Sequence, residues 1–311
     1  MRKVISGLLE FSVIFLLLLL FLFTHKLDIE MIFSETSKCL WEMKISYAFF
    51  AFALYIISVI VVATRWKAVL KALGYDIEVR SLVPVIFGSI FINNFTPASR
   101  MGGEPLRVLW LAKQFKIRKK EAFLSIIYER GIEAIPVLFL LIIAIYFNFP
   151  QIFRKYVFRL FPFFIFIGIA PIACYPLRSR FAKTLERYGF SRFPREAFFP
   201  TLFFSSLMWV MDVLRFKVVT LAFDVYLPIH VIALLSIGYL FLGIVPLTLG
   251  GMGIVEGGLI SLLLTFGIPV GKAIGIVALE RVISYGISSL IGAVSLFYFG
   301  GMEAWKSIKS Q

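Results

Sequence analysis

The sequence has few of the residues from which most enzyme sites are built. Its 311 residues include only two cysteines and two histidines, and charged residues make up 16%. Cys39 and Cys174 lie far apart in unrelated contexts, which argues against a disulfide framework or a cysteine metal site. His25 and His230 lie near predicted outer ends of apolar segments, where we expect interfacial side chains. No Walker A or dinucleotide-binding motif is present. We therefore expect no cofactor, no metal site and no enzyme activity driven by ATP.

Hydrophobic residues are abundant instead. They make up 60% of the chain and aromatic residues 17%, whereas a soluble domain is about half apolar and about a quarter charged. Mean hydropathy is +0.93, and apolar runs such as LLEFSVIFLLLLLFLF are long enough to cross a bilayer. The sequence therefore predicts an all-α polytopic membrane protein, with a single integral-membrane domain over residues 1–311.

The net charge of +14 predicts cytoplasmic loops rich in Lys and Arg, and not a nucleic-acid partner. The first apolar run follows Met1-Arg2-Lys3 and is longer than the ~7–15-residue core of a signal peptide. No small-x-small cleavage site follows it, so we expect an uncleaved first helix. No stretch is long and polar enough for a soluble catalytic domain.

Loop charges predict about six full spans in the cell (plasma) membrane, with both termini cytoplasmic. The predicted spans are residues 5–23, 45–64, 122–149, 157–176, 197–223 and 273–299. Residues 24–44 are predicted as an outer loop of balanced charge. Residues 82–112 hold two apolar arms, each too short for a crossing of about 20 residues, and both ends adjoin basic clusters, which predicts a re-entrant hairpin. Residues 229–267 form either a second hairpin from the opposite side or two full spans, because charge alone does not decide.

The two predicted hairpins share an order of polar residues. The shared order is Pro97, Gly102-Gly103 and Glu129-Arg130 in the first, and Pro246, Gly250-Gly251 and Glu280-Arg281 in the second. A hairpin followed by a span with an acidic–basic pair is typical of an inverted-topology repeat, whose broken helices build a substrate site near the midplane. We predict repeat units at residues 82–149 and 229–300. Glycine pairs that only allow close helix packing are the alternative.

Ionisable residues at bilayer depth cost at least ~2.5–3.5 kcal/mol each, so we expect them to pair or to face water. Arg100, Glu104 and Arg107 are spaced four and three apart, which places them on one helix face. Beside a broken helix start they suit a phosphate or another anion, although a salt-bridged helix start fits equally well. Glu129 and Glu133 share a helix face.

Arg130 points about 100° away from that face, and snorkelling is an alternative role for it. Glu280 and Arg281 lie deeper in the last span, where Tyr285 is placed to form a hydrogen bond beside Arg281. Glu256 follows the glycine-rich helix start at Gly253 and is the expected counterpart of Glu104, whereas Asp212 and Arg215 are expected to form a structural pair. The candidate substrate-binding residues are Asn93, Asn94, Arg100, Gly102, Gly103, Glu104, Arg107, Glu129, Arg130, Glu133, Gly250, Gly251, Gly253, Glu256, Glu280, Arg281 and Tyr285.

Four motifs, TPASRMGGEPLR, YERGIE, VPLTLGGMGIVEGG and LERVISY, resemble those of the flippase-like transmembrane domain of lysylphosphatidylglycerol synthases. The resemblance covers residues 45 to 300 and implies an integral-membrane lipid translocase, without specifying its lipid. In bifunctional members a separate soluble domain makes the lipid by aminoacyl transfer, and that activity is not carried over to this chain. Glu133 stands where the pattern leads us to expect an aspartate, a departure that keeps the charge.

Three functions fit these observations. The first is a flippase or scramblase that binds an anionic phospholipid or polyprenyl-phosphate headgroup through arginines. Glutamates hold these arginines in place and take up and release protons. The second is a membrane-embedded lipid-phosphate transferase with Glu104 or Glu129 as base. The third is a scaffold for a separate lipid-synthesising enzyme. In each case the expected partners are membrane lipids, and we predict a transporter-like protein and not an enzyme.

Overall fold

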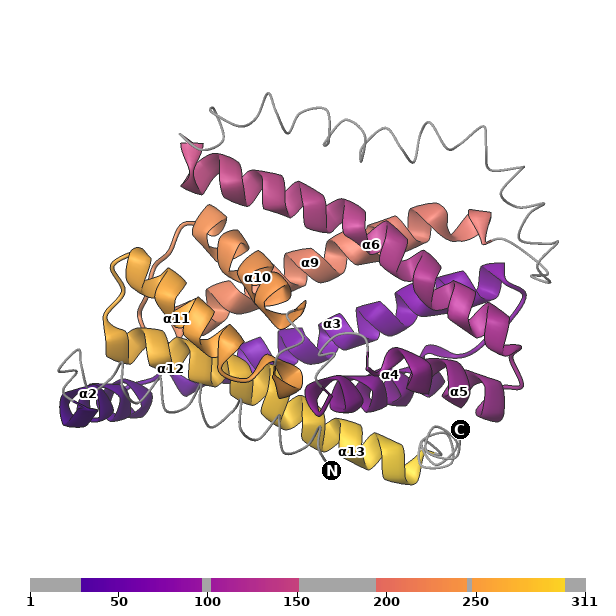
Figure 1. Cartoon of the computed structure of the whole chain (residues 1–311), viewed down its shortest axis with the longest axis horizontal. Coiled ribbons are helices and arrows are strands. Elements are labelled where there is room, and N and C mark those ends of the chain that lie inside the picture. Colours follow the sequence, from indigo (N-terminus) through magenta and orange to yellow (C-terminus); the bar gives the residue numbers. More distant parts are fainter. Residues whose placement is uncertain (1–28, 97–101, 151–193, 245–247, 300–311) are drawn as a thin grey trace, which may run out of the picture.

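The computed structural model describes residues 29–96, 102–150, 194–244 and 248–299, and these residues form helices and connecting turns without a strand (Figure 1). Four helical rods are long and apolar enough to cross a membrane: α3 (Ile45–Ala72), α6 (Lys119–Asn148), α9 (Phe198–Leu221) with the preceding turn Arg195–Ala197, and Val270–Tyr298. The last rod comprises α12 (Val270–Arg281), a π-helical turn (Val282–Ile287) and α13 (Ser288–Tyr298). Single-turn π-helices are frequent at functional sites.

The remaining apolar helices are shorter and form two pairs. The first pair is α4 (Val79–Asn94) with α5 (Glu104–Gln114), and the second is α10 (Ile229–Ile244) with α11 (Ile254–Thr265). A helix of 16 residues such as α4 is about 24 Å long at 1.5 Å per residue, which is shorter than a hydrocarbon core of ~30 Å. The two pairs lie at opposite ends of the long rods, and their tips meet in the middle of the molecule (Figure 1).

A hydrogen bond joins the two tips, and a second fixes the first tip to the last rod. The backbone N–H of Gly250 donates to the carbonyl of Thr96 at 3.3 Å, and the hydroxyl of Tyr285, in the π-helical turn, donates to the carbonyl of Asn94 at 2.8 Å. Gly250 adopts a φ of +57°, and a Cβ at this position would lie 2.5 Å from the carbonyl oxygen of Asn94. Glycine is therefore required where the second tip touches the first.

Each helix pair packs into its own hydrophobic core. One core joins α4, α5 and the first half of α6 to the second half of α3. The other joins α10, α11 and α12 to α9 and the start of α3. The central helices α3 and α9 pack along each other between the two cores. Large apolar side chains such as Phe49, Phe203, Leu290 and Phe297 are exposed on the outer surface, as lipid-facing side chains of a membrane protein are.

Two predicted boundaries are wrong. Helix α3 continues past Thr64 to Ala72, because Arg65 is buried among carboxylates instead of ending the span in a polar loop. The predicted outer loop at residues 24–44 contains the helix α2 (Ile29–Trp41), which packs against α12. The predicted spans at residues 5–23 and 157–176 lie outside the described residues, and the other four predicted spans correspond to the four long rods.

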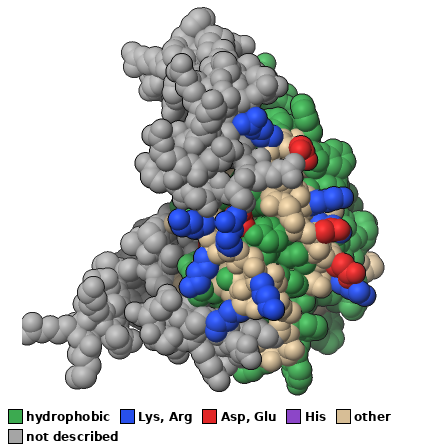
Figure 2. All heavy atoms as spheres, turned by 90° about the vertical axis from the view of Figure 1, so that its right-hand side faces the viewer, with side chains coloured by type: hydrophobic (Ala, Val, Ile, Leu, Met, Phe, Trp, Pro, Cys, Tyr) green, Lys and Arg blue, Asp and Glu red, His purple; other side chains and the backbone are tan. Residues whose placement is uncertain are grey.

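Charge is distributed unevenly between the two ends of the molecule. Figure 2 shows the end at which α6 and α9 begin, where blue basic side chains outnumber red acidic ones. The exposed basic residues there are Lys71, Arg80, Lys113, Lys116, Arg118, Lys119, Lys120 and Arg195. The end at which α2 lies balances its exposed lysines with Glu30, Glu35, Glu42 and Asp224.

Candidate functional site

A cavity of about 240 Å³ lies where the two hairpin tips meet the long helices. Residues from α3, α4, α5, α6, α9, α10, α11, α12 and the π-helical turn line it, together with Gly250 from the second tip. Its charged lining residues are Arg65, Arg107, Arg130, Arg215, Arg281, Glu129, Glu133 and Asp212. Among its uncharged lining groups are the amides of Asn93 and Asn94 and the hydroxyls of Ser58, Ser89 and Ser284. This is a polar cavity inside an apolar protein.

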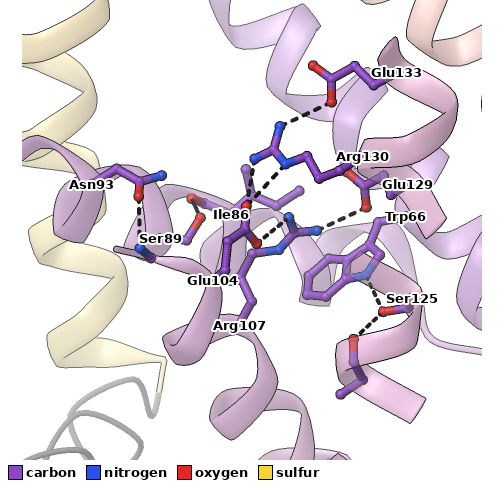
Figure 3. A network of polar contacts seen from close by, with 12 residues as sticks. Trp66, Ile86, Ser89, Asn93, Glu104, Arg107, Ser125, Glu129, Arg130 and Glu133 are labelled. Carbon is purple, nitrogen blue, oxygen red and sulfur yellow. Dashed lines mark hydrogen bonds and ion pairs between the residues drawn. The ribbon is translucent and has the colours of Figure 1, made fainter. Parts of the chain in front are cut away.

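Six charged side chains from α3, α5 and α6 form a closed ring of ion pairs on one side of the cavity, of which Figure 3 labels five. In order around the ring they are Arg65, Glu129, Arg107, Glu104, Arg130 and Glu133. Neighbouring N and O atoms lie 2.7 Å to 3.1 Å apart, and the contact between Arg65 and Glu129 is also direct. We call these six side chains ring one. Because its three positive charges alternate with three negative charges, ring one is neutral.

Packing fixes most of this ring. Arg65, Arg107 and Glu129 are almost fully buried, and the guanidinium of Arg107 lies 3.9 Å from the centre of the Trp66 ring. The indole N–H of Trp66 donates to Ser125 at 3.0 Å, which holds the ring in place (Figure 3). Arg130 differs, because 46% of its side chain is exposed. It is the arginine of the ring that a molecule in the cavity can most easily reach.

A second cluster of charged side chains also borders the cavity, and among the described residues its ion pairs form no closed ring. Arg215 pairs with Asp212 at 2.5 Å and with Glu280 at 2.7 Å. Arg281 pairs with Glu256 at 2.5 Å, and its Nη2 donates to the carbonyl of Gly250 at 3.4 Å. Glu256 also accepts the backbone N–H of Gly253 at 2.6 Å, so it caps the first turn of α11 while it holds Arg281.

The two clusters repeat the same pairings. An arginine on a central helix pairs with a glutamate 64 residues later in the Arg65–Glu129 contact and 65 residues later in the Arg215–Glu280 contact. A second glutamate, at the start of each hairpin's second arm, pairs with the arginine that directly follows the glutamate of the first contact. Glu104 pairs with Arg130, 26 residues later, and Glu256 pairs with Arg281, 25 residues later.

Arg65 was not among the predicted site residues, and Arg215 was predicted to pair only with Asp212. A sequence signal was available for both, because the runs Arg65-Trp66-Lys67 and Arg215-Phe216-Lys217 match. A residue with positive φ also follows each of the two helices, Gly74 after α3 and Asp224 after α9.

The structure places most predicted site residues around this cavity. Those that line it are Asn93, Asn94, Arg107, Glu129, Arg130, Glu133, Gly250 and Arg281. Glu104, Glu256 and Glu280 do not line it but bind arginines that do. Gly102, Gly103, Gly251 and Gly253 lie in the tips, and Arg100 lies outside the described residues.

The structure adds contacts for two predicted site residues. Tyr285 lies beside Arg281, whose guanidinium is 5.4 Å from its ring centre, and its hydroxyl donates to the carbonyl of Asn94 near the end of α4. Asn93 lines the cavity, but its side-chain oxygen also accepts the N–H of Gly103 at 2.8 Å. A Cβ on Gly103 would lie 2.2 Å from the carbonyl of Ser89, so glycine lets the returning arm start against α4.

The described part of the chain holds no group of three or more His, Cys, Asp or Glu side chains placed to bind a metal ion. What the cavity does offer is guanidinium, carboxylate, amide and hydroxyl groups. The guanidinium groups donate charge-assisted hydrogen bonds to phosphate and carboxylate groups, and the amide N–H and hydroxyl groups can add further donors.

Comparisons with known proteins agree with the motifs. The family described as "Lysylphosphatidylglycerol synthase TM region" matches residues 8–292. A "UPF0104 membrane protein" of Methanothermobacter thermautotrophicus is 25% identical over 295 residues, covering 84% of this chain and 87% of that protein. Its namesake in Methanocaldococcus jannaschii is 22% identical over 312 residues, covering 90% and 93%. No solved structure matches the chain.

Proposed function

This chain belongs to the lysylphosphatidylglycerol synthase transmembrane-region family of multi-pass membrane proteins, and from that premise we propose that it is a lipid flippase or translocase for lipids with an anionic headgroup. The observation that carries the proposal is the cavity between the two hairpin tips, with five arginines in its lining. Ionisable side chains at membrane depth cost free energy, and in membrane proteins they mark the pathways of substrates or ions.

The proposed architecture has six spans and two re-entrant hairpins that enter from opposite sides, as an inverted repeat. The short paired helices, the tip-to-tip hydrogen bond between Gly250 and Thr96 and the repeated arginine–glutamate pairings support it. The basic end seen in Figure 2 is placed in the cytoplasm, because cytoplasmic loops carry the excess of Lys and Arg. The α4–α5 hairpin then enters from the cytoplasm and the α10–α11 hairpin from outside.

The anionic preference follows from which charges reach the cavity. Five arginines line it but only three carboxylates do, since Glu104, Glu256 and Glu280 lie behind the arginines that they bind. Arg130 and Arg281 both line the cavity and belong to the two proposed repeat units. A phosphate between them would receive donors from both, which suits a substrate that is handed from one hairpin to the other.

The size of the cavity favours a headgroup over a whole lipid. Pockets for drug-sized ligands measure ~300–1,000 Å³, and this cavity measures about 240 Å³. We propose that only the headgroup enters it while the acyl or prenyl tails remain in the bilayer. This arrangement lowers the barrier to flipping, because the polar part of the lipid crosses the hydrocarbon among polar side chains.

Translocation by purified protein in phosphatidylcholine proteoliposomes tests the proposal. The probes are fluorescent phosphatidylglycerol and a fluorescent polyprenyl phosphate, and reduction of the dye in the outer leaflet reports how fast the lipid moves. Wild type is expected to move at least one probe, and Arg281→Ala at least tenfold more slowly. Lys272→Ala is the matched control, because this lysine lies two and a half helical turns earlier on α12 and does not line the cavity. Wild type that moves neither probe would refute the proposal.

A further inference from the structure

The second charged cluster carries one negative charge more than the first. Ring one contains three arginines and three glutamates. The second cluster contains Arg215 and Arg281 with the three carboxylates of Asp212, Glu256 and Glu280. No further Lys or Arg of the described residues pairs with these carboxylates. With every group ionised, the second cluster would hold an uncompensated negative charge at membrane depth, which is costly.

Glu280 is the carboxylate with the least compensation. It is fully buried, its Oε1 accepts a hydrogen bond from Arg215 at 2.7 Å, and its Oε2 accepts none from the part of the chain that the structure describes. In ring one the corresponding glutamate, Glu129, uses both oxygens, one for Arg65 and one for Arg107. The second cluster has no such second arginine, so one carboxylate oxygen remains buried without a donor.

Among the described residues, the groups that interact with Glu280 include Arg215 and no second cation. From α9 they are Arg215 and Asp212, from α3 Tyr55, and from its own rod Ser284. Tyr239 of α10 donates to the Ser284 hydroxyl at 3.2 Å. A proton on the free oxygen would neutralise the extra charge, and it needs no cage of ligands such as a metal ion requires. Asp212 and Ser284 both line the cavity, which connects Glu280 to the place of the headgroup.

We propose that Glu280 is a proton-binding site and that a proton taken up there accompanies each anionic headgroup through the cavity. The inference rests on the proposed function for its lipid and adds the ion that drives its movement. An anionic headgroup beside Arg281 or Arg215 adds a further negative charge to the cluster and competes with Glu280 for Arg215. Binding of the headgroup therefore strengthens binding of the proton, and the reverse holds by linkage.

The transport step is balanced in charge. One proton comes from water on the side where the headgroup enters, binds to Glu280 as a carboxylic acid, and returns to water on the side where the headgroup leaves. One proton with one monoanionic headgroup moves no net charge. A pH difference should thus drive the lipid, whereas a membrane potential should not.

The test uses the proteoliposomes described above and measures the steady-state ratio of the fluorescent anionic lipid between the two leaflets. With one proton per lipid, a gradient of one pH unit supports a ratio of up to about tenfold, because one unit is a tenfold difference in proton activity. We expect wild type to approach this ratio, with the lipid accumulating in the leaflet on the alkaline side. A sodium gradient at equal pH, or a potassium-diffusion potential, is expected to leave the ratio near one.

Glu280→Gln removes the proton site while keeping the size of the side chain. It is expected to lose the pH-driven asymmetry and to keep a ratio near one even if the lipid still equilibrates. The matched control is Glu121→Gln, because Glu121 is also buried and ion-paired but lies outside the cavity. That variant should keep the asymmetry of wild type.

The outcomes separate the inference from the proposed function. Wild type that moves the lipid with a ratio near one under a pH gradient overturns the proton site and leaves the flippase proposal intact. Wild type that moves no lipid overturns the flippase proposal. In that case, and also if Glu280→Gln does not fold, difference infrared spectroscopy of wild type decides. An anionic lipid added to the purified protein should produce the carbonyl band of a newly protonated carboxyl, and absence of this band contradicts the inference.

Discussion

Replacement of Glu129 by glutamine tests whether the ring of ion pairs holds the first hairpin against α3 and α6. The Glu129 side chain is 0% exposed and accepts hydrogen bonds from Arg65 and Arg107. A glutamine has one acceptor oxygen and an NH₂ group that cannot accept from an arginine. The variant therefore satisfies one arginine at most, and the ring, neutral in wild type, gains a buried positive charge.

Breaking a buried ion pair by removing one partner costs about 3–5 kcal/mol. Each arginine keeps one other carboxylate, Glu133 for Arg65 and Glu104 for Arg107. We therefore expect Glu129→Gln to lose about 3 kcal/mol of unfolding free energy, at the lower end of that range. The double variant with Arg65→Met removes the excess positive charge, and we expect it to regain at least about 1 kcal/mol relative to the single variant.

The assay is denaturant-induced unfolding in detergent micelles, followed by tryptophan fluorescence and circular dichroism. Glu78→Gln serves as the control, because its pair with Arg80 is largely exposed and exposed pairs contribute ~0–1 kcal/mol. If Glu129→Gln is as stable as this control, or if the double variant is less stable than the single one, the ring does not hold the hairpin as argued here.

Two further predictions concern the hairpin tips and the basic end. Gly250→Ala would place a Cβ 2.5 Å from the carbonyl of Asn94 and strain a φ of +57°, so we expect translocation to fall at least tenfold. Gly257→Ala, where a Cβ meets nothing within 4 Å, should translocate like wild type, and equal rates for both variants would refute the tip contact. Burial, together with the hydrogen bond to Glu121, raises the pKa of Tyr75 above its usual value. The Tyr75 hydroxyl therefore stabilises the fold below about pH 10 and stops doing so as the pH rises through its raised pKa. Wild type should lose more of its melting temperature than Tyr75→Phe between about pH 8 and about pH 11, and parallel losses would contradict this role.

Local features of the sequence were sufficient to predict the short helix pairs and five of the eight charged residues that line the cavity. Apolar arms too short to span, glycine pairs and Glu-Arg pairs are all readable along the chain, and the structure brings Glu104 to Arg130 and Glu256 to Arg281 as their similar positions suggest. Glycine was also a reliable signal, because a side chain at Gly103 or Gly250 would collide with backbone.

Pairings between distant residues could not be predicted in this way. Arg65 looks like the first charge of a cytoplasmic loop until the glutamates of α6, more than 60 residues later, are packed against it. For the same reason Arg215 was assigned to its neighbour Asp212, although it also binds Glu280. The closure of ring one depends on how three helices pack. For the pairings of Arg65 and Arg215 with distant glutamates, the sequence signal was the match between the Arg-aromatic-Lys runs that begin at these two arginines.

The most direct test of the central claim is a cryo-electron microscopy map of the protein in nanodiscs that contain an anionic lipid, phosphatidylglycerol. The account predicts density for one anionic headgroup in the cavity between Arg130 and Arg281, with its tails in the bilayer. It also predicts two hairpins whose tips meet near the midplane without crossing the membrane. A headgroup bound elsewhere with the cavity unoccupied, or α10 and α11 each crossing the whole bilayer, would contradict it.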